Sequence, residues 1–338
     1  MTRLFTDGAE MGDVLPFNSA YHSVSTSIKR SGLYSYYGSL WGIGNIGSPV
    51  FIDDKSEIYI KCAFYIDTTD KDGANGIWVG YESSTPIMSV GCKYLDFITA
   101  SVNNVVVDSS SIFTPIKEWF LLECYFKMAD STDGKIIVKF NGIEIINYIG
   151  DTKPSTSAVF DRVYFGMISG ATYIGGQYLD DIAINDTSGS VDNSWCGDGH
   201  VIALVPDGVG DASELTPSSG SVNYLMVDAT PYNTTDYVES STPDAKDLYN
   251  LASSGLVSGS HIISRVFAEV IALDTTTGSG AIATVFQSGS SVVEETSQNL
   301  STAYGSYKGT DNYLNPATGL AWTVDELDAL QVGVVVKA

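Results

Sequence analysis

The sequence is poor in basic residues and poor in charge overall. Only 17 of its 338 residues are Lys or Arg, against 40 Asp or Glu, which gives a formal net charge of −23 at pH 7. Such a chain repels phosphate backbones and anionic lipid, so we expect no nucleic-acid partner and no polybasic membrane contact. Two uses of the acidity remain, solubility at high local concentration and binding of divalent cations.

Long hydrophobic runs are missing as well. No stretch approaches the length of a transmembrane span, so we expect no membrane insertion. The opening MTRLFTDGAEMGDVLPF has no apolar run after Arg3 that would make it a signal peptide. Hydrophobic residues nevertheless make up 44% of the chain, which is enough for packed cores and too much for a disordered chain.

Cysteine is scarce. The four cysteines are Cys62, Cys92, Cys124 and Cys196, with no CxxC motif and no pair close in sequence. An even count is compatible with disulfides, but Cys62 and Cys124 fall on alternating apolar faces, so we expect buried free thiols.

What the sequence does contain is period-two alternation, the pattern of half-buried strands. Apolar side chains alternate through Glu57–Asp67 and again through Trp119–Lys127, and we assign Trp119 to the core. The segment KFNGIEI predicts a hairpin between Lys135–Phe140 and Ile143–Ile149, because Asn-Gly suits the turn that matches strand twist.

Helical patterns are nearly absent. Thr323 and Glu326 form a capping box at the start of a short helix in WTVDELDAL. Residues 240–254 suit either a short helix or a loop turn. We see no internal repeat and no heptad run, which counts against a fibre shaft.

A polar, turn-rich stretch near residues 186–200 marks a domain boundary. The prediction is an all-β chain of two domains, residues 1–188 and residues 189–338. In the second domain, the clear strands are Ile262–Leu273, Ala281–Gln287 and Gly333–Lys337.

The first domain resembles the concanavalin A-like lectin/glucanase superfamily in its laminin-G-like branch. The likeness rests on RLFTDGAEMGD, IYIKCAFYIDTTDKDGANGIWVGYESS, KEWFLLECYFKMADSTDGKIIVKFNGIEIINYIGDT and VYFGMISGATYIGGQYLDDIAIND. It implies a jelly-roll sandwich over about 185 residues.

The second domain resembles a β domain that recurs in predicted bacteriophage structural proteins. The stretches that carry this likeness are DDIAINDTSGSVDNSWCGDGHVIALVPDG, TTDYVESSTPDAKDLYNL and YLNPATGLAWTVDELDALQVGV. It implies a smaller C-terminal β-sandwich that serves in assembly.

Enzyme motifs are absent from the sequence. A glucanase of the first domain's superfamily carries Glu-x-Asp-x-x-Glu or Glu-x-Asp-x-Glu on one strand, and neither pattern occurs here. The histidines His22, His200 and His261 have no metal or triad spacing, and no nucleophile elbow, Walker loop or dinucleotide fingerprint appears. We therefore predict a protein that is not an enzyme and requires no cofactor.

The resemblance implies a structural calcium ion near the first and last strands of the jelly roll. Asp7 in FTDGAE, with Asp180 or Asp181 in YLDDIAI, matches the positions of its ligands. One of the adjacent pair must face inward if the strand is regular, which favours a cation partner. The alternative is that these acids lie in water at strand ends or pair with Arg3 or Arg162.

A glycan site on such a fold uses exposed aromatic rings with Asp and Asn side chains. Trp41, Trp78 and Asn75 are the candidates, joined by Asn103 and Asn104. The alternative reading is that the rings are core residues and that Asn103-Asn104 is a hairpin turn.

These patterns lead to one functional hypothesis and two alternatives. The hypothesis is a non-catalytic bacteriophage virion protein, either a capsid decoration or head fibre or a tail component, made in the bacterial cytoplasm. It would bind other virion proteins, form a homo-oligomer, with a trimer favoured, and adhere to host surface glycan by avidity. The alternatives are a secreted or cell-surface carbohydrate-binding adhesin and a polysaccharide depolymerase.

Overall fold

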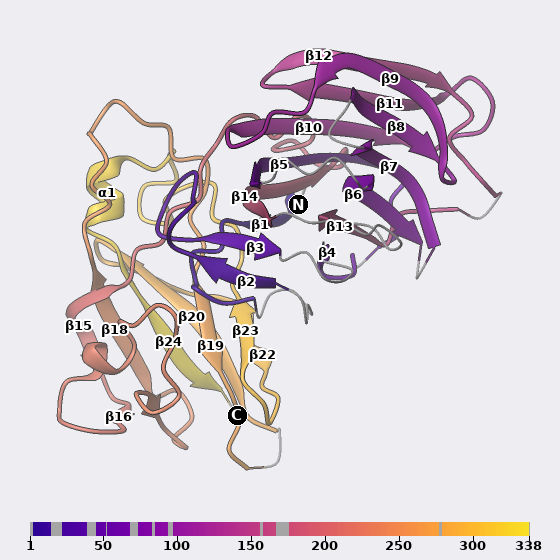
Figure 1. The fold of residues 1–338 in the computed structure, drawn as a ribbon. Coiled ribbons are helices and arrows are strands. Elements are labelled where there is room, and N and C mark those ends of the chain that lie inside the picture. Colours follow the sequence, from indigo (N-terminus) through magenta and orange to yellow (C-terminus); the bar gives the residue numbers. More distant parts are fainter. Residues whose placement is uncertain are drawn as a thin grey trace. The chain divides into compact units, whose positions relative to one another are not determined.

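The computed structural model describes residues 3–14, 22–38, 45–51, 53–67, 74–82, 85–93, 97–155, 158–166, 176–276 and 279–337. The chain divides into two compact units, Met1–Ile202 and Ala203–Ala338. Almost every regular element is a strand (Figure 1), which confirms the all-β prediction. No helix among the described residues has the length and apolarity needed to cross a membrane.

Unit 1 is a two-sheet sandwich. Its eight-stranded sheet has the order β12-β11-β10-β5-β14-β3-β2, and β1 pairs with β14 beside β3. The strands of this sheet are β1 (Arg3–Asp7), β2 (His22–Ser25), β3 (Ser35–Gly38), β5 (Glu57–Asp67), β10 (Trp119–Lys127), β11 (Gly134–Phe140), β12 (Ile143–Gly150) and β14 (Gly176–Asp186).

The second sheet of the sandwich has six strands in the order β4-β13-β6-β7-β8-β9. Their bounds are β4 (Asn45–Gly47), β6 (Ala74–Glu82), β7 (Thr85–Lys93), β8 (Phe97–Val102), β9 (Val105–Phe113) and β13 (Arg162–Gly166). The strands adjacent in each sheet are antiparallel.

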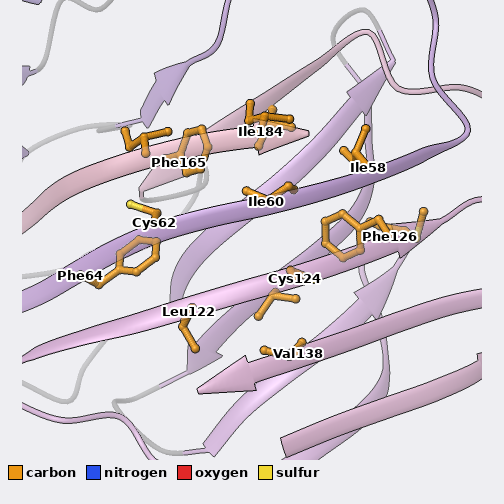
Figure 2. Packing of buried hydrophobic residues seen from close by; sticks show 14 of the residues in the cluster. Ile58, Ile60, Cys62, Phe64, Leu122, Cys124, Phe126, Val138, Phe165 and Ile184 are labelled. Atoms are coloured by element: carbon orange, nitrogen blue, oxygen red, sulfur yellow. The ribbon is translucent and has the colours of Figure 1, made fainter. Parts of the chain in front are cut away.

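The core of unit 1 lies on the face that each alternating strand turns inward (Figure 2). Phe64 of β5 stacks on Phe120 of β10 with ring centroids 5.8 Å apart. Cys62 and Cys124 are buried in the same core and are free thiols, whereas Cys196 is free and half-buried. The side chain of Cys92 lies outside the described residues.

The predicted hairpin joins β11 to β12. Asn141 and Gly142 both have positive φ, at 47° and 81°, as the tight turn requires. The Asn141 side chain also accepts a hydrogen bond from the Leu121 backbone N–H at 2.8 Å, which ties the turn to β10.

Residues 189–202 belong to unit 1, although the sequence placed the boundary at residue 188. Their polar, glycine-rich composition is typical of a linker. In the structure, however, Asn185 donates to the carbonyl of Ser194 at 2.7 Å, and Glu123 accepts from the N–H of Gly197 at 2.8 Å. The segment is therefore held against strands of the first domain.

Unit 2 has a sheet of order β15-β18-β24-β20-β21, with β22 also paired to β20, and two-stranded ladders β16–β17 and β19–β23. Its elements are β15 (Pro206–Ser213), β16 (Thr216–Pro217), η1 (Asn223–Met226), β17 (Val238–Glu239), β18 (Lys246–Leu251), β19 (Glu269–Ala272), β20 (Ala281–Ser288), β21 (Ser291–Glu294), β22 (Gln298–Asn299), β23 (Gly305–Lys308), α1 (Val324–Asp328) and β24 (Gln331–Lys337).

The sequence predictions agree with the structure near the C-terminal end of unit 2 but less well in its middle. The Thr323–Glu326 capping box is present at α1. The predicted strand Ile262–Leu273 shrinks to β19, and Ile262 is 97% exposed because no strand pairs with it. The helix considered for residues 240–254 does not form; β18 occupies that stretch and pairs with β15 and β24.

Candidate functional site

A row of four aromatic side chains crosses the outer face of the eight-stranded sheet. Tyr37, Tyr178, Tyr65 and Trp119 come from the neighbouring strands β3, β14, β5 and β10 and stand directly opposite one another in the strand register. Each is adjacent in sequence to a residue of the core, so alternation turns all four rings away from the core. We call this set the aromatic row.

The rings of the aromatic row are in contact along its length. The ring-centroid distance is 4.9 Å from Tyr37 to Tyr178, 5.7 Å from Tyr178 to Tyr65, and 5.6 Å from Tyr65 to Trp119. Tyr178 is 9% exposed, and the other three side chains are half-buried. Burial, and then the neighbouring Tyr37 and Asp67, raise the pKa of Tyr178, so its hydroxyl stays protonated and can donate a hydrogen bond.

An ion pair lies next to the aromatic row. Asp67, two residues beyond Tyr65 on β5, is 3.5 Å from the ammonium group of Lys117, two residues before Trp119. Both side chains are exposed, at 36% and 61%, so the row is bordered by accessible charge of both signs.

The same sheet face is partly covered by residues 194–201, which we call the cover segment. Its Trp195 ring packs edge-on against Tyr59 at 5.3 Å, and the carbonyl of Gly199 accepts a hydrogen bond from Lys61. Burial lowers the pKa of Lys61, an effect that the nearby Asp181 opposes. The cover segment thus contributes partners to charged groups that would otherwise lie in water on the sheet.

A bulge in β14 places Asp180 and Asp181 against the cover segment. The register with β5 shifts between Asp180 and Ala183, and Asp181 adopts a positive φ of 52°. Asp180 and Asp181 lie between Leu179 and Ile182, which both face the core, and Asp180 is opposite Ala63, which lies between the core residues Cys62 and Phe64; both carboxylates are fully buried. The strand is therefore not regular at this point, and the inward-facing carboxylate that the sequence predicted does not occur.

Hydrogen-bond donors already occupy the oxygens of this carboxylate pair. Asp181 accepts from Arg30 at 2.9 Å, from the Ser31 hydroxyl at 2.8 Å and from the Val201 N–H at 2.9 Å, and its Oδ2 lies 2.9 Å from Nδ1 of His200. Asp180 accepts from the backbone N–H groups of Arg30 and Ser31 at 2.8 and 3.2 Å. Burial, and then the charge of Asp181, raise the pKa of Asp180.

The predicted calcium ligands do not fit a calcium ion. Asp7 accepts from the Tyr36 hydroxyl at 2.5 Å and from the Ala9 N–H at 2.7 Å, so its Oδ1 also faces donors. A calcium ion needs six to eight oxygen ligands and would have to compete with these donors, including the Arg30 cation on Asp181. Within the described ranges, no group of three or more His, Cys, Asp or Glu side chains is arranged to hold a metal.

The side chains of the predicted glycan residues Trp41, Trp78 and Asn75 lie outside the described residues, so this site stays a prediction. Trp41 lies outside the described residues, and Asn75 and Trp78 lie on β6, where the side chains are outside them too. Asn103 and Asn104 form the β8–β9 turn, with φ of 48° and 62°.

The sequence interpretation also missed the aromatic row. Trp119 was assigned to the core, which is wrong, because Phe120 takes the inward position and Trp119 the outward one. The signal was present in the alternation itself: Tyr65 and Trp119 occupy the positions between the apolar ones.

Comparison with known proteins gives a fold likeness and no family. No family model matches the chain, and no curated protein matches it. Similar solved structures include an endo-β-1,4-glucuronan lyase from the fungus Trichoderma reesei, with 11% identity, a TM-score of 0.43, and coverage of 57% of this chain and all of that one.

Two further similar structures come from other sources. An alginate lyase of polysaccharide lyase family 7 has 10% identity and a TM-score of 0.36, covering 50% of this chain and 83% of that one. A carbohydrate esterase of the Shiga toxin-encoding bacteriophage phi24B has 12% identity and a TM-score of 0.38, covering 54% and 98%. These likenesses agree with the jelly-roll sandwich. The narrower assignment to a concanavalin A-like branch stays a prediction.

These structures correct one prediction. The sequence interpretation concluded that the chain is not an enzyme because glycosidase, triad and nucleotide motifs are missing. The proteins similar to it in structure are named as lyases and as an esterase, classes that the missing glycosidase carboxylate pattern does not test. The exclusion of catalysis therefore does not hold.

Proposed function

We propose that unit 1 binds an extended polysaccharide across the outer face of its eight-stranded sheet. The observation that carries the proposal is the aromatic row. Sugar rings stack their C–H faces on Tyr and Trp, and these side chains lose little conformational entropy on binding.

The geometry of the row suits a polymer better than a single sugar. Its four rings follow one another across four strands, with neighbouring centroids 4.9 to 5.7 Å apart, a spacing comparable to the size of one pyranose ring. The rings are tilted or perpendicular to one another, so each presents a different edge or face. The tyrosine hydroxyls and the Asp67–Lys117 pair add hydrogen-bond donors and acceptors for sugar hydroxyls.

The rings also have the support that a binding surface needs. The strands beneath them belong to the packed core, with Phe64 and Phe120 immediately behind Tyr65 and Trp119. A site on rigid strands is pre-organised, which reduces the entropy that binding costs.

The test is affinity electrophoresis and calorimetric titration of the full chain against a panel of bacterial surface polysaccharides. Trp119→Ala should weaken binding at least tenfold, because a buried aromatic anchor contributes on the order of 2 kcal/mol. Phe113→Ala is the matched control, since this ring is 61% exposed on β9 of the other sheet and should leave the affinity unchanged. Absence of binding to any polymer, or unchanged binding in Trp119→Ala, would overturn the proposal.

The same samples serve to detect turnover. Lyase and esterase are the activities named for the structures similar to this chain, so bond cleavage is the first activity to assay. An unsaturated product absorbing in the ultraviolet reports elimination, and released carboxylic acid reports de-esterification.

We also propose, from the sequence, that the protein is located on a bacteriophage particle, contacts other virion proteins and forms a homotrimer. Many copies on one particle would bind host glycan with high avidity. Mass spectrometry of purified particles would test the location, and light scattering of the purified chain would test the oligomeric state. A secreted or cell-surface adhesin is the alternative, and recovery of the chain from a bacterial envelope without phage particles would favour it.

A further inference from the structure

Lysine side chains collect on the sheet face that carries the aromatic row. Lys127 of β10 and Lys135 and Lys139 of β11 each neighbour a core residue and therefore project from the outer face. We call these three residues the lysine cluster. Lys117, 61% exposed beside the aromatic row, adds a fourth cation to this face.

This local charge is opposite to that of the chain. The whole sequence has 17 basic and 40 acidic residues. On β5, β10 and β11 the accessible outward acids are Glu57 and Asp67, while Glu123 is buried and bonded to the N–H of Gly197. On the neighbouring β12, the exposed Glu144 faces Lys139 in the register and adds one more acid. Four accessible cations against three acids give the sheet face a net charge of +1, and the exposed Asp130 and Asp133 lie in the turn beyond Lys127 and Lys135.

The strand register places two of the cations in an unfavourable pair. Lys127 and Lys135 are directly opposite on β10 and β11, and like charges in this relation destabilise a sheet. Glu57 lies 3.7 Å from Lys127 and offsets only one of them. Among the described residues, Lys135 has no ion-pair partner, so an anion between the two ammonium groups would relieve the repulsion.

Aromatic rings flank the lysine cluster as well. Tyr59 and Tyr125 stack with centroids 4.6 Å apart, and Tyr125 stands one outward position before Lys127. The ammonium group of Lys139 lies 3.7 Å from the ring centroid of Trp195. Cations beside aromatic faces are the combination that recognises a sugar bearing a negative group, because the ring packs while the charge pairs.

We propose that the polysaccharide bound by unit 1 is anionic, and that the lysine cluster binds its carboxylate or sulfate groups. The proposal rests on the proposed function and specifies the class of ligand. Trp119 and Lys127 lie at the two ends of β10, about 25 Å apart at the usual strand rise. The cover segment lies over Glu123 and Lys61 between these two points, so a polymer of several sugars that contacts both the aromatic row and the lysine cluster passes over this segment. Lys117 lies beside the part of the polymer that crosses the aromatic row.

The test compares polymers that differ in charge. The full chain is titrated calorimetrically with polygalacturonate as the carboxylate probe, dextran sulfate as the sulfate probe, and dextran as the neutral probe, at low and high salt. We expect one or both anionic polymers to bind more tightly than dextran, and their affinity to fall as salt rises. The relative affinity of the two anionic polymers identifies the preferred group.

Variants then locate the charge effect. Lys135→Gln should weaken anionic polymer binding about two- to fivefold, the range for one exposed ion pair, and Lys127→Gln/Lys135→Gln should weaken it further. Lys153→Gln, on the loop after β12, is the matched control and should leave the affinity for the anionic polymers unchanged. Dextran affinity should be the same in all of them.

Each other outcome contradicts a different claim. If dextran binds as tightly as the anionic polymers and Lys135→Gln is silent, the anionic ligand is overturned while the aromatic-row function stands. If no polymer binds, the proposed function fails as well. If double-stranded DNA competes as well as polygalacturonate, the face is a general polyanion surface and recognition of an anionic polysaccharide is overturned.

Discussion

Replacing Asp181 by Asn should destabilise unit 1 substantially. Asp181 is fully buried and meets Arg30, Ser31, His200 and the Val201 N–H, all between 2.8 and 2.9 Å. Asn is also tolerated at a positive φ, so the substitution changes the charge without straining the backbone at the bulge.

The expected magnitude follows from two opposing effects. Removing one partner of a buried ion pair costs about 3–5 kcal/mol when the remaining charge is left uncompensated. Two effects offset part of this cost, together about 1 kcal/mol: Arg30 keeps its pair with Asp198, and Asp180, whose pKa is raised by burial and then by Asp181, loses the neighbouring negative charge. The net loss of unfolding free energy is about 2–4 kcal/mol, equivalent to a drop in Tm of about 5–15 °C for a unit of this size.

The measurement is differential scanning calorimetry of the full chain, with urea unfolding followed by tryptophan fluorescence. Asp198→Asn is the matched control, because Asp198 also pairs with Arg30 but its side chain is 61% exposed. Exposed pairs contribute at most about 1 kcal/mol, so this variant should remain close to the wild type. An Asp181→Asn protein within about 0.5 kcal/mol of wild type would refute the view that Asp181 anchors the cover segment.

Two further predictions concern pH and unit 2. Burial raises the pKa of Glu10 from 4.5 to about 7, so its stabilising effect is fully present below pH 4.5 and is lost as the pH rises through 7. In thermal scans, the Tm of the wild type should fall as the pH rises from 4.5 to 7, and this fall should be smaller in Glu10→Gln. An equal fall in both proteins would contradict the raised pKa of Glu10. Asp247, fully buried, accepts from two backbone N–H groups, from Asn223 and from Tyr249. Asp247→Ala should cost unit 2 about 3–5 kcal/mol by urea unfolding, against about zero for the exposed control Asp207→Ala, and equal stabilities would refute the prediction.

The strands of unit 1 could be predicted where local pattern and tertiary structure agree. The alternation of Glu57–Asp67 and Trp119–Lys127 matches β5 and β10 residue for residue, and Asn141-Gly142 makes the turn its chemistry requires. Both segments bury one complete face in the same core, so the sequence pattern and the packing coincide.

The candidate site could not be predicted from local sequence patterns, because it depends on contacts between residues that are far apart in the sequence. The bulge at Asp181 exists because loops far away in sequence, around Arg30 and Val201, supply donors to it. Nothing in YLDDIAI signals those partners. The aromatic row likewise requires the order of β3, β14, β5 and β10 in the sheet, which period-two alternation cannot give.

Hydroxyl-radical footprinting of the full chain with a bound polysaccharide tests the central claim most directly. It reports which aromatic side chains the ligand shields. The account predicts that Trp119 and Tyr65 become protected while Phe113, 61% exposed on the opposite sheet, keeps its reactivity. Protection confined to Phe113 and its neighbours, with Trp119 and Tyr65 unchanged, would contradict it.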